Sequence, residues 1–124
     1  MFNQKLISGI LKQIAESIDI VQDRFAGIHS VDDFLNSTLG LMTLDSICMK
    51  LIAIGESIKN LDKHTDGKLL LNYPAVDWKG VKGVRDIISH HYFNLDAEEI
   101  FNICSAHLPA LHATVKQMIA DLQK

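Results

Sequence analysis

The spacing of the apolar residues constrains the fold of this chain more than any other feature. Between residues 3 and 25, apolar side chains recur every three or four positions, as on one face of a helix: Ile7, Leu11, Ile14, Ile18, Val21 and Phe25. A second helix, predicted to end near Asp62, has a broad apolar face: Leu44, Ile47, Cys48, Leu51, Ile54, Gly55 and Ile58. No segment alternates with a period of two, so the sequence predicts an all-α fold.

Capping and helix-breaking residues divide the first half of the chain. Ser30 is expected to cap a short helix that starts at Val31, and Gly40 is expected to mark a bend. Gly55 lies in the middle of the second long helix, where glycine costs about 1 kcal/mol relative to alanine. Close approach of a neighbouring helix would compensate for this cost.

The second half of the chain is predicted to add two more main helices. Residues 63–76 are expected to form a loop, after which Asp77 caps a helix over residues 78–90. Asp96 resembles the start of a capping box for the last helix, and Pro109 predicts a kink or break within it. These elements predict an up-and-down four-helix bundle with an additional short helix.

The composition indicates one globular domain. A chain of 124 residues, 48% of them apolar, is the size of a single domain over residues 1–124 and is not disordered. No apolar run approaches the roughly 20 residues of a membrane span, so no membrane association is expected. Cys48 and Cys104 lie in segments expected to be buried helix, which favours a reduced, cytoplasmic protein.

The charge distribution limits what the chain can bind. A net charge of −3 argues against a long polyanion as the ligand. Lys79, Lys82 and Arg85 nevertheless lie close together, and Asp86 is the only acidic residue between positions 79 and 92. This local basic patch could hold one or a few phosphates, although an ordinary solvated helix face has the same pattern. Glu56 is either a partner for one of these basic residues or a solvated side chain.

The segment 85–92 carries the residues best suited to chemistry. Arg85 suits phosphate because its planar fork donates two parallel hydrogen bonds and keeps its charge. His90 suits proton transfer because imidazole titrates near neutral pH. Together they indicate phosphodiester chemistry or phosphate recognition.

Arg85 and His90 do not meet well on one straight helix. At 100° per residue their directions differ by about 140°, whereas Arg85 shares a face with Tyr92 and Asp86 shares another with His90. Either the helix ends near His90 and the chain turns inward, or Arg and His of two subunits meet across an interface.

The pattern of Arg85, four residues, His90, one residue and Tyr92 resembles the signature of the HepT-like toxins of the HEPN superfamily. The lead-in at 74–84, with its proline, aspartate, tryptophan and glycine, is similar to the family's as well, and so is the turn at 93–96. The resemblance implies a single HEPN-like helical domain.

The resemblance also implies a toxin of a type II toxin–antitoxin system that cleaves RNA without a metal or another cofactor. His90 would exchange a proton with the ribose 2′-hydroxyl or the leaving oxygen, and Arg85 would stabilise charge on the phosphate. Asp86 would orient one of these two side chains, and Lys82 and Lys79 would add phosphate contacts. Two copies of the motif would face a shared cleft in a homodimer or higher homo-oligomer.

The partner that the resemblance implies is an MNT-type nucleotidyltransferase antitoxin, which would add AMP to Tyr92 and so block the phosphate site. The alternative is a non-catalytic helical binding subunit that holds a nucleotidyltransferase or binds nucleotide. An RNA cleavage assay with and without His90→Ala would separate the two hypotheses.

Overall fold

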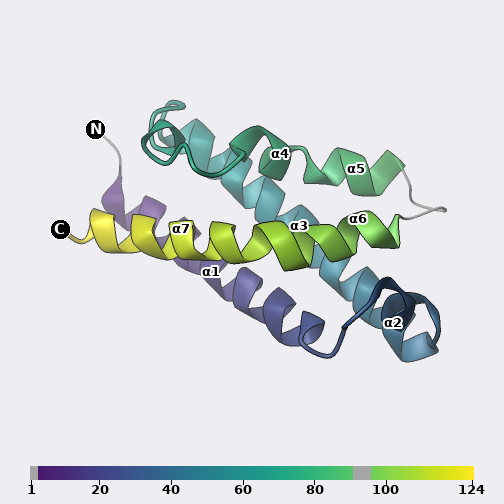
Figure 1. Cartoon of the computed structure of the whole chain (residues 1–124). Coiled ribbons are helices and arrows are strands. Elements are labelled where there is room, and N and C mark those ends of the chain that lie inside the picture. Colours follow the sequence, from purple (N-terminus) through teal and green to yellow (C-terminus); the bar gives the residue numbers. More distant parts are fainter. Residues whose placement is uncertain (1–2, 91–95) are drawn as a thin grey trace.

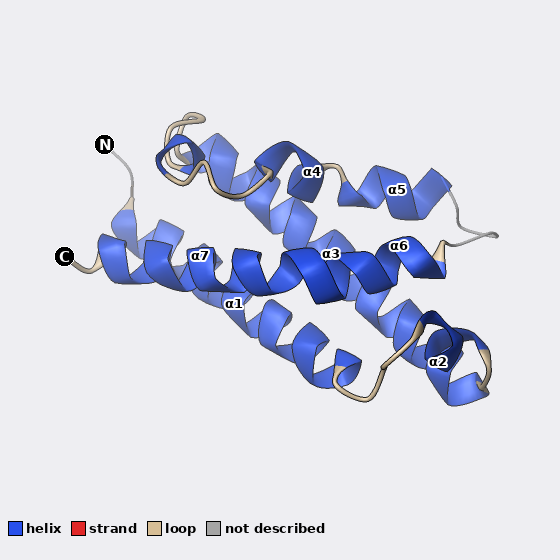
Figure 2. Ribbon diagram, viewed as in Figure 1, coloured by secondary structure: helices blue, strands red, loops and turns tan. Residues whose placement is uncertain are grey.

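The computed structural model describes residues 3–90 and 96–124, except for the side chains of residues 89 and 90. The described residues form helices and loops without a strand, which confirms the all-α prediction (Figures 1 and 2). The α-helices are α1 (Gln4–Phe25), α2 (Val31–Leu35), α3 (Thr38–His64), α4 (Trp78–Lys82), α5 (Val84–His90), α6 (Ala97–Asn102) and α7 (Leu108–Leu122). A 3₁₀ turn (Leu70–Asn72) and a π-helical turn (Ile103–His107) complete the set.

Four arms run alternately up and down, with α4 and α5 forming the third arm and α6 and α7 the fourth (Figure 1). The core lies where α1 packs against α3 and α7, because each of these helices buries one apolar face there. The apolar stripe predicted for the first helix is confirmed, since all its members from Ile7 to Val21 are buried. The predicted up-and-down bundle with a short additional helix, α2, is therefore confirmed.

The short helix α2 starts at Val31 as predicted, but its cap differs from the prediction. The Ser30 side chain makes no capping hydrogen bond. The Asp33 carboxylate instead accepts from the backbone N–H of His29, with an N–O distance of 2.7 Å. Asp33 thus bonds the residue before the expected N-cap, Ser30. Its carboxylate, on the first turn, also faces the positive end of the helix dipole.

Gly40 lies in the first turn of α3, so the predicted bend at this position is wrong. Ser37 caps the helix by accepting from the Gly40 N–H at 2.9 Å. A Cβ atom at residue 40 would overlap the carbonyl oxygen of Asp33. Glycine is therefore used here so that α2 can pack closely on the start of α3.

Gly55 has the role predicted for it, close approach of a neighbouring helix. A Cβ atom at residue 55 would lie 2.9 Å from the Val81 carbonyl oxygen and 2.9 Å from Val84 Cγ1. The third arm therefore packs directly on the backbone of α3 at this point.

The helix predicted over residues 78–90 is broken into α4 and α5 at Gly83. Asp77 caps α4 as predicted, since its carboxylate accepts from the Gly80 N–H at 3.1 Å. The Gly83 N–H turns back to the carbonyls of Lys79 and Gly80, which ends α4. Two glycines three residues apart make this stretch a weak helix former, so the break occurs there.

The loop before α4 is tied to the last helix. The Trp78 indole N–H donates to the Tyr73 carbonyl at 2.8 Å, and the Tyr73 hydroxyl donates to Asp121 on α7 at 2.7 Å. These two bonds fix the start of the third arm and thereby the position of the segment that follows it.

The fourth arm is interrupted where the sequence predicted a break. The π-helical turn Ile103–His107 precedes α7, and Pro109 lies in the first turn of α7, where its missing N–H is not needed. Asp96 caps α6 by accepting from the Glu99 N–H at 3.1 Å, which is one of the two hydrogen bonds of the predicted capping box.

Within the described part of the chain, one helix, α3, is long and apolar enough to cross a membrane by length and composition alone. An 18-residue window within it has a mean hydropathy of 1.5, although polar residues interrupt the apolar run. This is weak evidence for a span, since core helices of soluble proteins meet the same criterion. Of the residues in this window, 39% are buried inside the protein. The expectation of no membrane association, drawn from the lengths of the apolar runs, is therefore not tested by α3.

Candidate functional site

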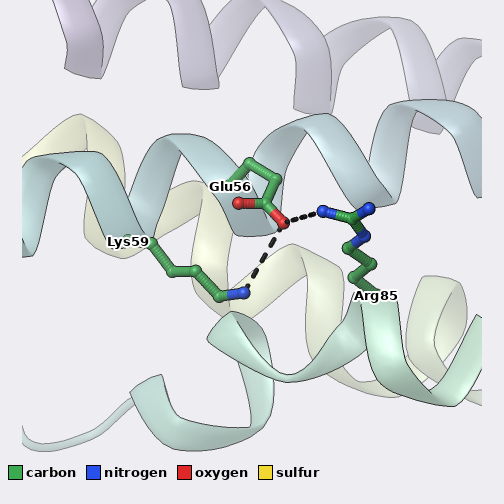
Figure 3. Close-up of polar contacts among 3 residues, drawn as sticks. All are labelled: Glu56, Lys59 and Arg85. Atoms are coloured by element: carbon green, nitrogen blue, oxygen red, sulfur yellow. Dashed lines mark hydrogen bonds and ion pairs between the residues drawn. The ribbon is translucent and has the colours of Figure 1, made fainter.

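The candidate site is built where the third arm, α4 followed by α5, runs antiparallel to α3. Two ion pairs fix this direction, because Lys82 Nζ lies 2.9 Å from Asp62 Oδ2 and Arg85 Nη1 lies 3.3 Å from Glu56 Oε1. Residue numbers thus rise along the third arm as they fall along α3, and Arg85 pairs with Glu56 in the second half of α3 (Figure 3).

Arg85 belongs to a cluster of three charged side chains, the Arg85 cluster, which also contains Glu56 and Lys59. Glu56 accepts from Arg85 at 3.3 Å and from Lys59 at 3.5 Å, through the same carboxylate oxygen (Figure 3). The hydrogen bond from Arg85, assisted by the charge of Lys59, holds the pKa of Glu56 below its usual range. Glu56 is therefore ionised at neutral pH, and one carboxylate faces two cations.

The Arg85 cluster is open to solvent. The Arg85 side chain is 60% exposed and that of Glu56 is 40% exposed. An exposed ion pair of this kind adds little to stability, because water screens it. It leaves the guanidinium fork accessible, and the net positive charge of the cluster suits a phosphate.

Lys82 and Lys79, the two lysines predicted to bind phosphate, have different surroundings. Lys82 is partly buried and paired with Asp62, so its charge is already compensated. Lys79 is exposed on α4, one turn before Lys82. Their predicted contacts with phosphate stay predictions, with Lys79 the more accessible of the two.

The predicted orienting residue, Asp86, is exposed, and the ion pair of Arg85 is made with Glu56 rather than with this neighbouring aspartate. The pairing of Glu56 with Arg85 was one of the two alternatives that the sequence offered. The third member of the cluster, Lys59, was missed, and its signal was the three-residue spacing from Glu56 that brings two side chains together on one helix.

The two remaining site residues stand at the edge of what is described. The backbone of α5 is helical as far as His90, and the His90 side chain lies outside the described residues. Tyr92 also lies outside them. Because the helix continues from Arg85 to His90, the separation of about 140° expected for a continuous helix applies to their positions on it.

The described residues form an all-helical bundle with an exposed cluster of cations around Arg85. The class of protein is therefore a helical domain with a site suited to phosphate. Comparison with known families identifies it further. The model of the family described as "Ribonuclease HepT-like" matches residues 14–118, and the chain belongs to this family.

Individual relatives agree with this family. The chain is 31% identical to "Putative RNase MJ0127" of Methanocaldococcus jannaschii, over 92% of this chain and 84% of the relative. It is 28% identical to "Putative RNase TTE0752" of Caldanaerobacter subterraneus, over 88% of this chain and 90% of the relative. It is 27% identical to "Probable ribonuclease HepT" of Thermococcus cleftensis, over 87% of this chain and 91% of the relative. No solved structure matches the chain significantly.

Proposed function

We propose that this protein is an endoribonuclease and the toxin of a type II toxin–antitoxin system. The observation that carries the proposal is the exposed Arg85 guanidinium, held by Glu56 at the start of the helix that leads to His90. Membership of the HepT-like family and relatives named as RNases support RNA as the substrate.

The proposed reaction is attack of a ribose 2′-hydroxyl on the adjacent phosphorus. His90 accepts the proton of the 2′-hydroxyl or donates one to the departing 5′-oxygen, and Arg85 stabilises the charge that develops on the phosphate. The new bond joins the 2′-oxygen to phosphorus while the bond to the 5′-oxygen breaks. The products therefore carry a 2′,3′-cyclic phosphate and a 5′-hydroxyl, and no metal or cofactor takes part.

The proposed active form is a homodimer. Arg85 and His90 are separated by about 140° around one helix, so a single copy does not direct both at one phosphate. A second copy related by a two-fold axis supplies the missing member of each pair. The proposal places this enzyme in the cytoplasm, where its RNA substrates are.

The proposed regulation is modification of Tyr92 by an MNT-type nucleotidyltransferase antitoxin. Transfer of AMP would add bulk and negative charge two residues from His90 and so occupy the place of the RNA phosphate. Tyr92→Phe is expected to keep RNase activity and to remain toxic beside an active antitoxin. Intact mass measurement of the co-expressed wild-type protein should show added AMP, and an unmodified protein in a neutralised complex would contradict this regulation.

The cleavage assay tests the activity itself. The purified protein should cleave RNA but not DNA of the same sequence, in the presence of EDTA, and leave 2′,3′-cyclic phosphate ends. His90→Ala should abolish cleavage, and His91→Ala is the matched control because it removes the neighbouring imidazole and should retain activity. Equal loss in both variants, or loss of wild-type activity in EDTA, would contradict the mechanism.

A further inference from the structure

A cavity of about 280 Å³ lies between the third arm and the fourth arm, and the Arg85 cluster does not line it. Its floor is made by Leu51 and Ile54 of α3, and one wall by Val84 and Ile87 of α5. The opposite wall comes from α6, the π-helical turn and the start of α7. This space is here called the interarm cavity.

Small residues leave the interarm cavity open. Ala75 and Gly80 line it from the side of the third arm, and Ala110 lines it from α7. Their side chains are too short to fill the space between two helices. The hydrogen bond from Tyr73 to Asp121 joins the loop before the third arm to the end of the fourth. The arms are therefore tied together at one end while the space between them stays open.

The walls of the cavity are mostly apolar, and one carboxylate lies among them. Glu99, on the first turn of α6, lines the cavity and is half-buried. The predicted capping box would turn this carboxylate back to the Asp96 N–H, but within the described part of the chain only the bond from the Glu99 N–H to Asp96 is made. A group that only accepts hydrogen bonds is thus available to a ligand that donates them.

The fourth arm changes its helix type where it borders the cavity. Ile103 and His107, the first and last residues of the π-helical turn, both line the cavity. A π-turn within a helical arm is rare and occurs frequently at functional sites. It lies in the same wall as Glu99, four residues further along the chain.

One end of the cavity lies beside the motif. The end of α5 and the start of α6 are at the same end of the bundle (Figure 1), and Ile87 and Glu99 line the cavity there. Ile87 is 38% exposed and forms the lip. His90 follows Ile87 by one turn of α5, about 4.5 Å along the helix axis. A ligand that extends from the cavity past Ile87 therefore reaches the position of His90.

The size of the cavity fits a nucleobase. A dry protein cavity of about 150 Å³ holds a benzene ring, so about 280 Å³ holds the two fused rings of a purine. Apolar side chains such as those of Leu51, Ile54 and Val84 suit the faces of a base that has left its stack. Unpaired bases of single-stranded RNA turn out of the strand and are recognised in this way.

The carboxylate selects among the bases. It accepts hydrogen bonds through two oxygens and donates none. Guanine presents two neighbouring donors, N1–H and the 2-amino group, which match the two oxygens as a bidentate pair. Adenine and cytosine have an unprotonated ring nitrogen beside the amino group, and uracil has its single N–H between two carbonyls. Each of these three bases would therefore set an acceptor against Glu99.

We propose that the interarm cavity is a base subsite that takes a guanine of the RNA substrate beside the cleaved bond, and that Glu99 recognises this guanine. The proposal rests on the proposed function, because it places the guanine next to the position of His90. It makes the enzyme selective for one nucleotide. The substrate must be single-stranded at this position, since a paired guanine uses the same donors to bind cytosine.

Cleavage of a single-stranded RNA of mixed sequence tests the selectivity. The cut sites should share a guanosine at one fixed position beside the cut. Inosine, which lacks only the 2-amino group, should lower cleavage at that site by about 10- to 100-fold, the discrimination of a good bidentate pair. 7-Deazaguanosine keeps both donors and should be cut like guanosine. Cut sites without a common guanosine, or equal cleavage of the inosine and guanosine RNAs, overturns the proposal.

The variant Glu99→Gln assigns the preference to the cavity. Its amide presents one acceptor and one donor, so the preference for guanosine over inosine should be lost. Glu98→Gln is the matched control, because it removes the same charge from the neighbouring residue, which is exposed and is not part of the cavity lining. It should keep the full preference. A Glu99→Gln protein that prefers guanosine as strongly as the wild type overturns the subsite.

Binding of an uncleavable strand separates this proposal from the proposed function. A 2′-O-methyl RNA with one guanine among uracils has no attacking hydroxyl, so its affinity by fluorescence anisotropy reports base recognition alone. Hypoxanthine or adenine in place of guanine should weaken binding about 10- to 100-fold. Guanine-selective binding by a protein that cleaves no RNA would refute the proposed function and support the subsite. RNA cleavage without a guanine preference would refute the subsite and leave the activity standing.

Methyl NMR of the full chain identifies the occupant. The guanine-containing strand should shift the signals of Ile54, Val84 and Ile103, which line the cavity, and leave that of Ile10, a core residue of α1 outside it. Unchanged signals at all three lining residues would contradict the subsite. A cavity that responds to benzylamine and not to the guanine strand would identify an apolar amine as its ligand and overturn the proposal.

Discussion

Arg85 is held by an acidic side chain from another helix, Glu56, 29 residues earlier in the chain. The neighbouring Asp86 does not serve, because adjacent side chains on a helix point about 100° apart. Glu56 stays ionised at neutral pH, since the hydrogen bond from Arg85 lowers its pKa. At the residue scale, the guanidinium is therefore held in place while its fork remains open to solvent.

Substitutions at Arg85 should affect cleavage without affecting the fold. Arg85→Ala is expected to lower kcat by about 10²–10³, the usual cost of removing one charge-stabilising donor. Arg85→Lys keeps the charge but loses the two-pronged donor, so most of the loss should remain. Helical circular dichroism and Tm should stay near those of the wild type because the side chain is exposed. An unfolded Arg85→Ala protein would mean that Arg85 is a structural residue.

Glu56→Gln should weaken cleavage less than Arg85→Ala does. The amide still accepts a hydrogen bond but carries no charge, so the guanidinium is held more loosely and kcat should fall by about 10-fold. Lys59→Gln is the matched control, as it removes the other partner of Glu56 and leaves Arg85 paired. An activity of Glu56→Gln equal to that of the wild type would show that the pairing does not position Arg85.

The two thiols predict how stability depends on pH. Burial raises the pKa of Cys48 to about 11, with a smaller contribution from Asp45, and raises that of Cys104 to about 12, against an ordinary 9.0. The unfolded chain then releases protons at a lower pH than the folded one. The free energy of unfolding should therefore be fully retained below pH 9 and decline as the pH rises toward 11 and 12.

Urea unfolding at intervals between pH 8 and pH 11 would measure this decline. Cys48→Ala/Cys104→Ala should be less stable than the wild type at pH 8, because it leaves space in the core, but its stability should fall less steeply above pH 9. Equal slopes for the two proteins would show that the pKa values of the thiols do not differ between the folded and the unfolded chain.

At the element scale, the helices that bury a continuous stripe were predictable from the sequence, and their ends were less so. The period of Ile7 to Val21 defines α1 because burial selects one face of a helix. Gly40 and Gly83 illustrate what local sequence does not reveal. Gly40 contacts the backbone of α2, which the spacing of apolar residues does not reveal. Gly83 ends α4 through local hydrogen bonds to Lys79 and Gly80, which the apolar period does not reveal either.

The candidate site shows the same division. Arg85 and His90 were predictable as reactive residues because their chemistry and spacing are local. Which acidic residue pairs with Arg85 could not be predicted from the sequence. The pairing with Glu56 depends on how the third arm is aligned along α3. A close approach at Gly55 was predicted from the sequence, but not that Val81 and Val84 of the third arm make it.

Gly55→Ala tests the contact that positions α5. The new Cβ would lie 2.9 Å from the Val81 carbonyl and from Val84 Cγ1, so the third arm must move. We expect a net loss of about 1–2 kcal/mol, because the strain exceeds the gain of up to about 1 kcal/mol from helix propensity. Gly9→Ala is the control, since nothing lies within 4 Å of its Cβ, and it should be stabilising. Chemical denaturation of both variants measures their free energies of unfolding. A Gly55→Ala protein more stable than the wild type would contradict the close contact.

At the scale of the whole molecule, one copy leaves the proposed site incomplete. The motif positions Arg85 and His90 on different sides of a continuous helix. In the proposed homodimer, a second copy supplies the missing member of each pair.

The most direct test of a shared ribonuclease site is to mix Arg85→Ala with His90→Ala under conditions in which subunits exchange. Each variant alone should be inactive. If each site takes Arg85 from one subunit and His90 from the other, every mixed dimer regains one intact site, and the mixture should recover about one quarter of wild-type RNA cleavage. No recovery, with mixed dimers shown to form by mass spectrometry, would contradict the shared site.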